Sequence, residues 1–184
     1  MHKSIPAIAA ILSLGAGFAL YQYTQKPQPA SATVKPVAKK TLSVLNKKRI
    51  DFSLPDLTDQ QRKFSEWDGK VILLNFWATW CPPCRREIPA FIQLQDDYAN
   101  KGFQVIGVAI DEKDAVIDYT DGLGVNYPVL LGNAAALDIG ARYGNRFGQL
   151  PYSLIIDKKG IIRYIGKGEL HYEGIEKEIQ PLLK

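Results

Sequence analysis

The chain has 184 residues, 46% of them hydrophobic, and a formal net charge of +4, which is enough apolar sequence for one folded domain with extra segments. The positive charge comes from residues 1–48, which hold seven lysines and no acidic residue, whereas residues 49–184 carry 16 basic and 19 acidic residues. Residues 49–184 also show no basic run with interleaved aromatic residues, so we expect no nucleic-acid partner.

An almost uncharged apolar segment, residues 5–20, follows a short basic start. Together with Tyr21 and Tyr23 as an interfacial end, it predicts a membrane anchor or signal segment over residues 1–23. A retained anchor is favoured over cleavage after residues 30–32, Ala-Ser-Ala, which lie far beyond the apolar run. The downstream lysines oppose export under the positive-inside rule, but the layout is that of an export signal. We therefore expect a periplasmic or otherwise extracytoplasmic domain, anchored in the inner membrane by residues 5–23.

The next segment, residues 24–48, is rich in Lys, Pro, Ala, Ser and Thr and poor in large apolar side chains. Such a composition cannot bury a core, so we predict a flexible linker. The folded domain is then expected to span residues 49–184.

Strand and helix patterns alternate through this domain. Runs of β-branched and aromatic residues predict strands at residues 49–57, 62–64, 71–77, 103–110, 127–131, 152–157 and 161–165. Helical spacing of apolar residues predicts helices at residues 85–100, 115–121, 134–143 and 173–183, with one helical turn at 65–69. The almost wholly apolar residues 71–77 are expected to form a central strand buried on both faces. This order predicts an α/β sheet with helices on both faces.

The chain has two cysteines, Cys81 and Cys84, placed between the strand at 71–77 and the following helix. A CxxC motif in this position is typical of a thiol–disulfide redox site. A thiol at a helix N-terminus faces unpaired N–H groups and the positive end of the helix dipole, which stabilise its thiolate. We assign the attacking thiolate to Cys81, which should be the more exposed, and the resolving thiol to Cys84.

A zinc site and a purely structural disulfide are the competing interpretations of this pair. Zinc needs four ligands, and the two histidines, His2 and His171, lie near opposite ends of the chain, so no metal site is predicted. A disulfide that closes so short a loop stabilises a fold little. We expect no cofactor beyond a redox-active disulfide between Cys81 and Cys84.

A longer stretch around the cysteines carries a family resemblance. Residues 75–87 read Asn-Phe-Trp-Ala-Thr-Trp-Cys-Pro-Pro-Cys-Arg-Arg-Glu, and Leu-Pro stands at 150–151 before a predicted strand. With these residues the chain resembles the thioredoxin superfamily, and within it the membrane-anchored TlpA/ResA-like thiol–disulfide oxidoreductases with a redoxin domain. The resemblance implies a thioredoxin-like central mixed sheet flanked by helices, with an N-terminal hairpin and an inserted strand–helix unit around residues 109–131.

The resemblance also implies roles for single residues. Pro151 aligns with the family's cis-proline, so the backbone at Leu150 would face an incoming client chain. Glu87 matches an acid that assists proton transfer at the resolving thiol, which would require a pKa raised by partial burial; the alternative is an ordinary surface glutamate. Asn75 stands where ordinary thioredoxins carry a buried aspartate, which favours this role for Glu87. The other expected substrate contacts are Trp80, Pro82 and Pro83.

Together these features predict an exported thiol–disulfide oxidoreductase that reduces disulfides of client proteins. In the branch that the chain resembles, clients are apocytochrome c haem-site cysteines or copper-site cysteines of respiratory oxidases, and a membrane thiol protein donates electrons. We expect a monomer. Two alternatives stay open: a copper-binding metallochaperone, for which the chain lacks a wider cysteine spacing with a nearby histidine, and a thiol peroxidase, for which it lacks the proline-then-threonine approach to the cysteine.

Overall fold

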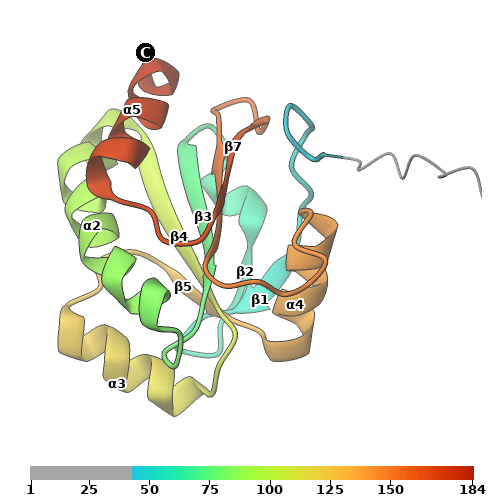
Figure 1. The fold of residues 1–184 in the computed structure, drawn as a ribbon, viewed down its shortest axis with the longest axis vertical. Coiled ribbons are helices and arrows are strands. Elements are labelled where there is room, and N and C mark those ends of the chain that lie inside the picture. Colours follow the sequence, from blue (N-terminus) through green and yellow to red (C-terminus); the bar gives the residue numbers. More distant parts are fainter. Residues whose placement is uncertain (1–42) are drawn as a thin grey trace, which may run out of the picture. The chain divides into compact units, whose positions relative to one another are not determined.

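A computed structural model describes residues 43–184 and shows a five-stranded mixed sheet flanked by four helices (Figure 1). The strand order is β5–β4–β3–β6–β7, and a separate hairpin joins β1 and β2. The strands are β1 (Ser53–Pro55), β2 (Gln61–Lys63), β3 (Val71–Trp77), β4 (Phe103–Ala109), β5 (Val129–Leu131), β6 (Tyr152–Ile156) and β7 (Ile162–Lys167). The helices are α2 (Pro82–Tyr98), α3 (Lys113–Leu123), α4 (Asn133–Arg142) and α5 (Tyr172–Leu183), with short 3-10 turns at η1 (Phe64–Trp67) and η2 (Ala99–Lys101).

The predicted pattern of strands and helices is confirmed, and β3 has the predicted bounds. β3 pairs in parallel with β4 and antiparallel with β6, and all seven of its residues are buried. The unit of α3 and β5 is the inserted segment, with β5 as an edge strand beside β4. The largest difference is in the first strand, where β1 is shorter than the predicted residues 49–57. Its hairpin has only three residue pairs, because β2 ends where η1 begins.

The ordered domain begins before residue 49, the predicted boundary. Asn46 N donates a hydrogen bond of 2.8 Å to Ile162 O, and Ile162 N donates one of 3.0 Å to Lys47 O. Residues 43–48 therefore belong to the domain, because backbone pairing with the edge strand β7 fixes a segment whose composition resembles a linker. The rest of the linker and the predicted membrane segment lie outside the described residues. Within residues 43–184 we find no helix long and apolar enough to cross a membrane.

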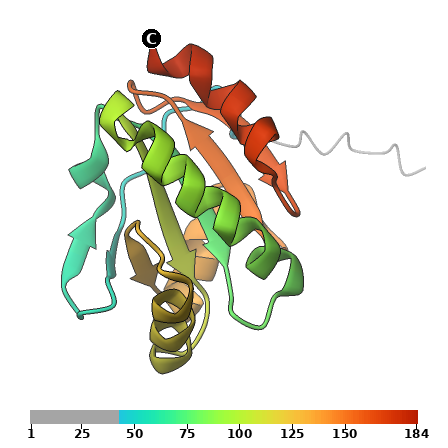
Figure 2. The same ribbon diagram turned by 90° about the vertical axis from the view of Figure 1, so that its left-hand side faces the viewer.

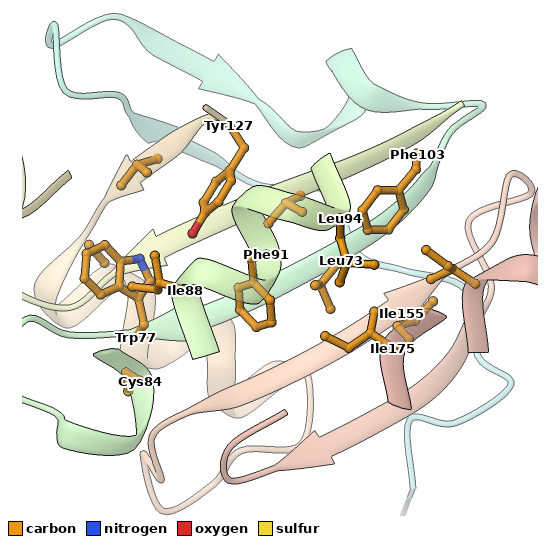
Figure 3. Close-up of a cluster of buried hydrophobic side chains, with 14 of the residues drawn as sticks. Leu73, Trp77, Cys84, Ile88, Phe91, Leu94, Phe103, Tyr127, Ile155 and Ile175 are labelled. Carbon is orange, nitrogen blue, oxygen red and sulfur yellow. The ribbon is translucent and has the colours of Figure 1, made fainter. Parts of the chain in front are cut away.

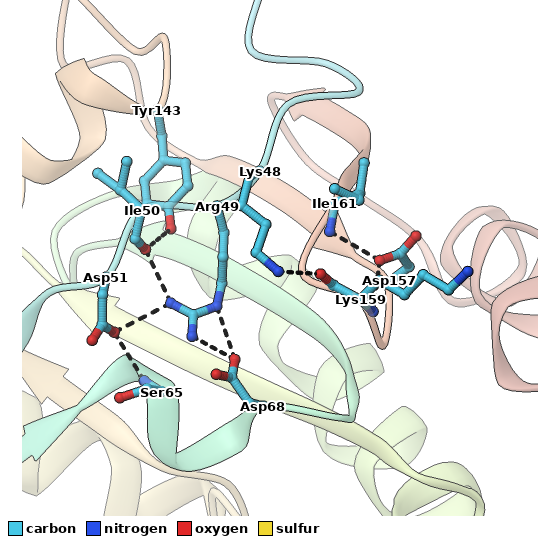
Figure 4. A network of polar contacts seen from close by, with 10 residues as sticks. All are labelled: Lys48, Arg49, Ile50, Asp51, Ser65, Asp68, Tyr143, Asp157, Lys159 and Ile161. Carbon is cyan, nitrogen blue, oxygen red and sulfur yellow. Dashed lines mark hydrogen bonds and ion pairs between the residues drawn. The ribbon is translucent and has the colours of Figure 1, made fainter.

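Arg49 fixes this entering segment to the domain (Figure 4). Its guanidinium donates hydrogen bonds to Asp68 and, over 3.2 Å, to Asp51, and it lies 4.9 Å from the ring centroid of Phe64. Ile50, the residue after Arg49, is held in the same way: its carbonyl oxygen accepts a hydrogen bond of 2.8 Å from the hydroxyl of Tyr143, just after α4. Polar contacts thus tie the N-terminal segment to η1 and to the end of α4.

Two hydrophobic clusters lie on opposite faces of the sheet. Alternate residues of β3 point to opposite faces, so Leu73 and Trp77 join one cluster while Leu74 and Phe76 join the other. The first cluster is covered by α2, α3 and α5, and the second by α4 together with the β1–β2 hairpin. Figure 2 shows α2 and α5 side by side across the sheet. Cys84 lies at the end of the first cluster near Trp77, so the cysteine pair is built directly onto this core (Figure 3).

Candidate active site

The helix α2 begins directly after Cys81. Pro82 occupies the first helical position, where the missing N–H of proline costs nothing, because that N–H would have no partner in the helix. Cys81 is the N-cap, and its Sγ accepts a hydrogen bond from Cys84 N over 3.4 Å. The first turn carries no acidic residue that would offset the helix dipole. This geometry favours a thiolate at Cys81.

Cys81 and Cys84 form a disulfide in the structure. Cys81 is 4% exposed and Cys84 is fully buried, so the expectation that Cys81 is the more exposed of the two residues is confirmed. Of the two residues, Cys81 is therefore the better placed to meet an incoming group, while Cys84 lies within the core.

Asp111 holds the loop that leads into the cysteines. It accepts hydrogen bonds from Thr79 N at 2.9 Å and from Thr79 Oγ1 at 2.5 Å. Asp111 follows β4 and Thr79 follows β3; because these strands are parallel, their carboxyl ends meet at one edge of the sheet. No local signal in the sequence predicts this contact, since 32 positions separate the two residues.

Tyr119 of α3 supports the first turns of α2. Pro89 lies inside α2 and has no N–H, so the carbonyl of Arg85, four residues earlier, lacks its usual helical donor. The hydroxyl of Tyr119 lies 3.5 Å from that carbonyl oxygen and donates to it. The ring of Tyr119 lies 5.7 Å from the ring of Trp77 and 5.3 Å from the guanidinium carbon of Arg85. A proline in the helix sequence is a sign that such a donor is needed.

Glu87 lies one turn after Cys84 on the buried face of α2 and is only 1% exposed. Its Oε1 accepts a hydrogen bond from Asn75 Nδ2 at 2.7 Å, and its Oε2 accepts one from Leu170 N at 3.0 Å. Asn75 Nδ2 also donates to the buried Ser153 Oγ at 2.9 Å. The alternative of an ordinary surface glutamate is therefore wrong.

The electrostatics of this carboxyl follow from its burial. Burial raises the pKa of Glu87 to about 8, although the hydrogen bonds from Leu170 and Asn75 lower it; the nearby charge of Glu169 raises it further. A carboxyl with such a pKa exchanges its proton near neutral pH, as a general acid–base group must. The burial that the proposed role requires is thus present.

The predicted substrate contacts differ in exposure, and their role as contacts stays a prediction. The Leu150–Pro151 peptide bond is cis, as the family resemblance implied, and Pro151 O accepts a hydrogen bond of 3.0 Å from Gly168 N. Trp80 is 65% exposed, Pro82 is exposed, and Pro83 and Leu150 are half-buried. An open hollow of about 390 Å³ beside Pro82 is also lined by Arg85, Arg86 and Tyr119. In the described part of the chain, no three His, Cys, Asp or Glu residues gather as a metal site would require.

The order of the sheet, with a CxxC pair where a helix leaves its central strand, defines a thioredoxin-like protein of the thiol–disulfide oxidoreductase class. The sequence comparison agrees: the chain belongs to the AhpC/TSA family, whose model matches residues 45–165. The TlpA/ResA-like resemblance is confirmed by its relatives.

Among these relatives is thiol-disulfide oxidoreductase ResA of Bacillus thuringiensis (strain Al Hakam), which is 34% identical over 178 residues, covering 95% of this chain and 94% of the relative. ResA of Geobacillus kaustophilus is 28% identical over 96% of this chain and 92% of its own length. Among solved structures, a thiol:disulfide interchange protein of the thioredoxin family from Chlorobium tepidum matches with a TM-score of 0.68 at 27% identity. That match covers 74% of this chain and 96% of the other.

Proposed function

We propose that the protein is an exported oxidoreductase that reduces disulfides of client proteins through Cys81 and Cys84. The observation that carries this proposal is the cysteine pair at the start of α2 with the buried carboxyl of Glu87 one turn behind it. The pair supplies the electrons, and the carboxyl supplies a proton acceptor beside the less accessible sulfur. No cofactor beyond the dithiol is needed for this reaction.

In the first step, the thiolate of Cys81 attacks one sulfur of a client disulfide. The client S–S bond breaks, a mixed disulfide forms between Cys81 and the client, and the released client thiolate takes a proton from solvent. Trp80, Pro82 and Pro83 contact the client, and the backbone at Leu150 beside Pro151 holds the client chain.

In the second step, Cys84 resolves the mixed disulfide. The thiol of Cys84 gives its proton to the ionised form of Glu87 and attacks Cys81 Sγ. The bond between Cys81 and the client breaks, the Cys81–Cys84 disulfide forms, and the second client thiolate leaves. Two electrons have then passed from the protein to the client, and a membrane thiol protein returns them by the reverse exchange.

The apolar segment of residues 5–20, with its interfacial end at residues 21–23, supports the proposed location, an extracytoplasmic domain held at the inner membrane. There the clients would be paired cysteines of haem or copper sites in respiratory proteins, and the domain would act as a monomer. Fusions of a reporter enzyme that is active only outside the cytoplasm, made after residue 48 and after residue 184, test this placement. Active fusions support export, and inactive ones contradict it.

Trapping of intermediates tests the two-thiol mechanism. Cys84→Ser should accumulate mixed disulfides with a disulfide-bearing peptide, because Cys81 can attack but nothing resolves the product. Cys81→Ser should neither reduce nor trap the peptide. Normal turnover by Cys84→Ser would show that the assigned roles are wrong. A matched Glu87→Gln variant should slow the second step, so its mixed disulfide should accumulate for a time and then decay, whereas that of Cys84→Ser should persist.

The direction of exchange is tested by the reduction potential of the cysteine pair in equilibrium with thiol buffers. A value near or below about −250 mV supports a reductase, because thioredoxin has a comparable potential. A value near about −120 mV would instead indicate an oxidant that forms disulfides. Copper titration and peroxide consumption, each with and without a thiol block, test the metallochaperone and peroxidase alternatives.

A further inference from the structure

The loop between β7 and α5, residues 168–171, touches both halves of the candidate site. Gly168 N donates to Pro151 O at 3.0 Å, and Leu170 N donates to Glu87 Oε2 at 3.0 Å. The side chain of Leu170 lies over Gly166, where an added Cβ would come within 3.0 Å of it. Leu170 also packs against the cluster that contains Cys84, so the loop forms the outer cover of the carboxyl.

An ion pair closes this cover at the surface. Arg86 Nε and Nη2 lie 2.8 Å and 2.6 Å from Glu169 Oε2, and the side chains are 59% and 22% exposed. Consecutive residues of α2, Arg86 and Glu87, thus hold consecutive residues of the loop, Glu169 and Leu170. The hydrogen bond from Arg86 keeps the pKa of Glu169 below its usual value, so Glu169 stays charged while Glu87 is neutral.

We propose that Arg86 and Glu169 are positioning residues that hold the loop of residues 168–171 closed over Glu87 and exclude water from its carboxyl. This inference rests on the proposed role of Glu87 in proton transfer. Neither residue touches a sulfur. They act through the loop by setting how often the carboxyl is exposed to solvent, and therefore how readily it exchanges its proton.

The charged and polar groups that face Glu87 decide how the loss of Arg86 would change the pKa of its carboxyl. They are Asn75 from β3, Ser153 from β6, the phenol of Tyr127 before β5, the backbone of Leu170, and the carboxylate of Glu169, which itself has Arg86 and His171 as neighbours. If Arg86 were only a charge, its removal would leave Glu169 uncompensated and raise the pKa of Glu87. If Arg86 holds the loop closed, its removal admits water and lowers that pKa. The two readings predict opposite signs.

The test compares Arg86→Gln with the full-length wild-type protein in its oxidised form. Exposed ion pairs contribute at most about 1 kcal/mol, equivalent to about a fivefold change in an opening equilibrium. Amide hydrogen exchange at Leu170 should therefore be faster in Arg86→Gln by up to about fivefold, with exchange at Val105 in β4 unchanged. The pKa of Glu87, followed by carbon NMR of its carboxyl and assigned with Glu87→Gln, should fall by about half a unit, because the open form releases the proton more easily.

Two further variants control the experiment. Arg86→Lys keeps an ion pair with Glu169 and should restore most of the protection at Leu170. Arg163→Gln removes a comparable pair with Asp157, at the other end of β7, and should change neither Leu170 exchange nor the pKa of Glu87. A rise in that pKa, or unchanged Leu170 exchange in Arg86→Gln, would overturn the proposal.

These readouts separate the inference from the proposed function. If Arg86→Gln loosens the loop and lowers the pKa while Glu87→Gln leaves disulfide exchange at the wild-type rate, the positioning role stands and the catalytic role of Glu87 fails. If Glu87→Gln slows disulfide exchange, but Arg86→Gln changes neither the amide protection of Leu170 nor the pKa of Glu87, the catalytic role of Glu87 stands and the positioning role of Arg86 fails.

Discussion

Replacing Glu87 by glutamine should remove a pH dependence from the stability of the protein. Both carboxyl oxygens now accept hydrogen bonds, from Asn75 and from Leu170 N. In the variant, the carbonyl oxygen of the glutamine still accepts the hydrogen bond from Leu170 N. Its NH2 group donates to Asn75 if the Asn75 amide flips, so that Asn75 Oδ1 accepts from the glutamine and from the Ser153 hydroxyl. The variant therefore keeps the shape and polarity of the site but has no proton to lose.

The expected change in the free energy of unfolding with pH follows from the two pKa values of the Glu87 carboxyl. They are 4.5 in the unfolded chain and about 8 in the folded protein. A folded-state pKa above the unfolded one means that the neutral carboxyl's contribution is fully present below pH 4.5. It declines by about 1.36 kcal/mol per pH unit and is lost as the pH rises through 8. Between pH 5 and 7.5, this single group should lower the free energy of unfolding by about 3 kcal/mol.

Urea unfolding of the oxidised proteins at several pH values, followed by tryptophan fluorescence, measures this difference. The relevant quantity is the difference in pH slope between the wild type and Glu87→Gln, so a constant loss of stability from imperfect hydrogen bonding does not matter. Glu173→Gln, which changes an exposed glutamate of α5, is the matched control and should follow the wild type. Parallel curves for Glu87→Gln and the wild type from pH 5 to 7.5 would refute the reasoning.

Four further substitutions test the packing by urea unfolding. Gly122→Ala in the last turn of α3 should stabilise the protein by about 0.5 kcal/mol, since nothing lies within 4 Å of the added Cβ and the unfolded chain loses freedom. Gly107→Ala in β4 should destabilise it by about 1–3 kcal/mol, because its Cβ would lie 3.0 Å from Trp77 Nε1; equal stability would show that the indole can move. Phe91→Ala, in the fully buried core, should cost about 3–5 kcal/mol. Phe147→Ala should change stability by less than about 0.5 kcal/mol, because Phe147 is 98% exposed, and a larger loss would reveal a contact made by this ring.

The local parts of the fold are predictable from the sequence because their signals are local. An apolar run predicts β3, and the helical spacing of apolar residues predicts α2. The helix begins at Pro82, three residues before the predicted start at residue 85, because proline is well suited to the first helical position. The burial of Glu87 is also readable in part, because the residue lies three positions after Cys84 and four before Phe91, on the face of α2 that packs on the sheet. Its partners are not readable, because Leu170 is 83 positions away and meets Glu87 only through the fold.

The backbone pairing of residues 46–47 with β7 likewise cannot be predicted from the amino-acid composition of the segment. Residues 43–48 follow a stretch rich in Lys, Pro, Ala, Ser and Thr and therefore read as part of a linker, yet their backbone groups pair with the free edge of a strand. Asn46 lies in a turn with a φ of 61°, where asparagine is enriched, so the turn itself has a local signal. The strand edge that the turn meets has none, because β7 lies far along the chain. The contact between Asp111 and Thr79 belongs to the same class, since it depends on two parallel strands ending together.

The position of the buried carboxyl has a physical consequence for proton exchange. A carboxyl on the central strand, at the position of Asn75, would lie on the sheet face that α2 covers, because the Asn75 amide contacts Glu87 of that helix. Glu87 instead lies in the first turns of a helix. The loop above it is held by the hydrogen bonds of Gly168 N and Leu170 N and by the Arg86–Glu169 pair. A contribution of at most about 1 kcal/mol from that pair is small beside a total stability of about 5–15 kcal/mol, but it changes the frequency of loop opening about fivefold. The surface pair therefore has little effect on whether the domain stays folded and a larger effect on how fast the carboxyl beside Cys84 can be reprotonated.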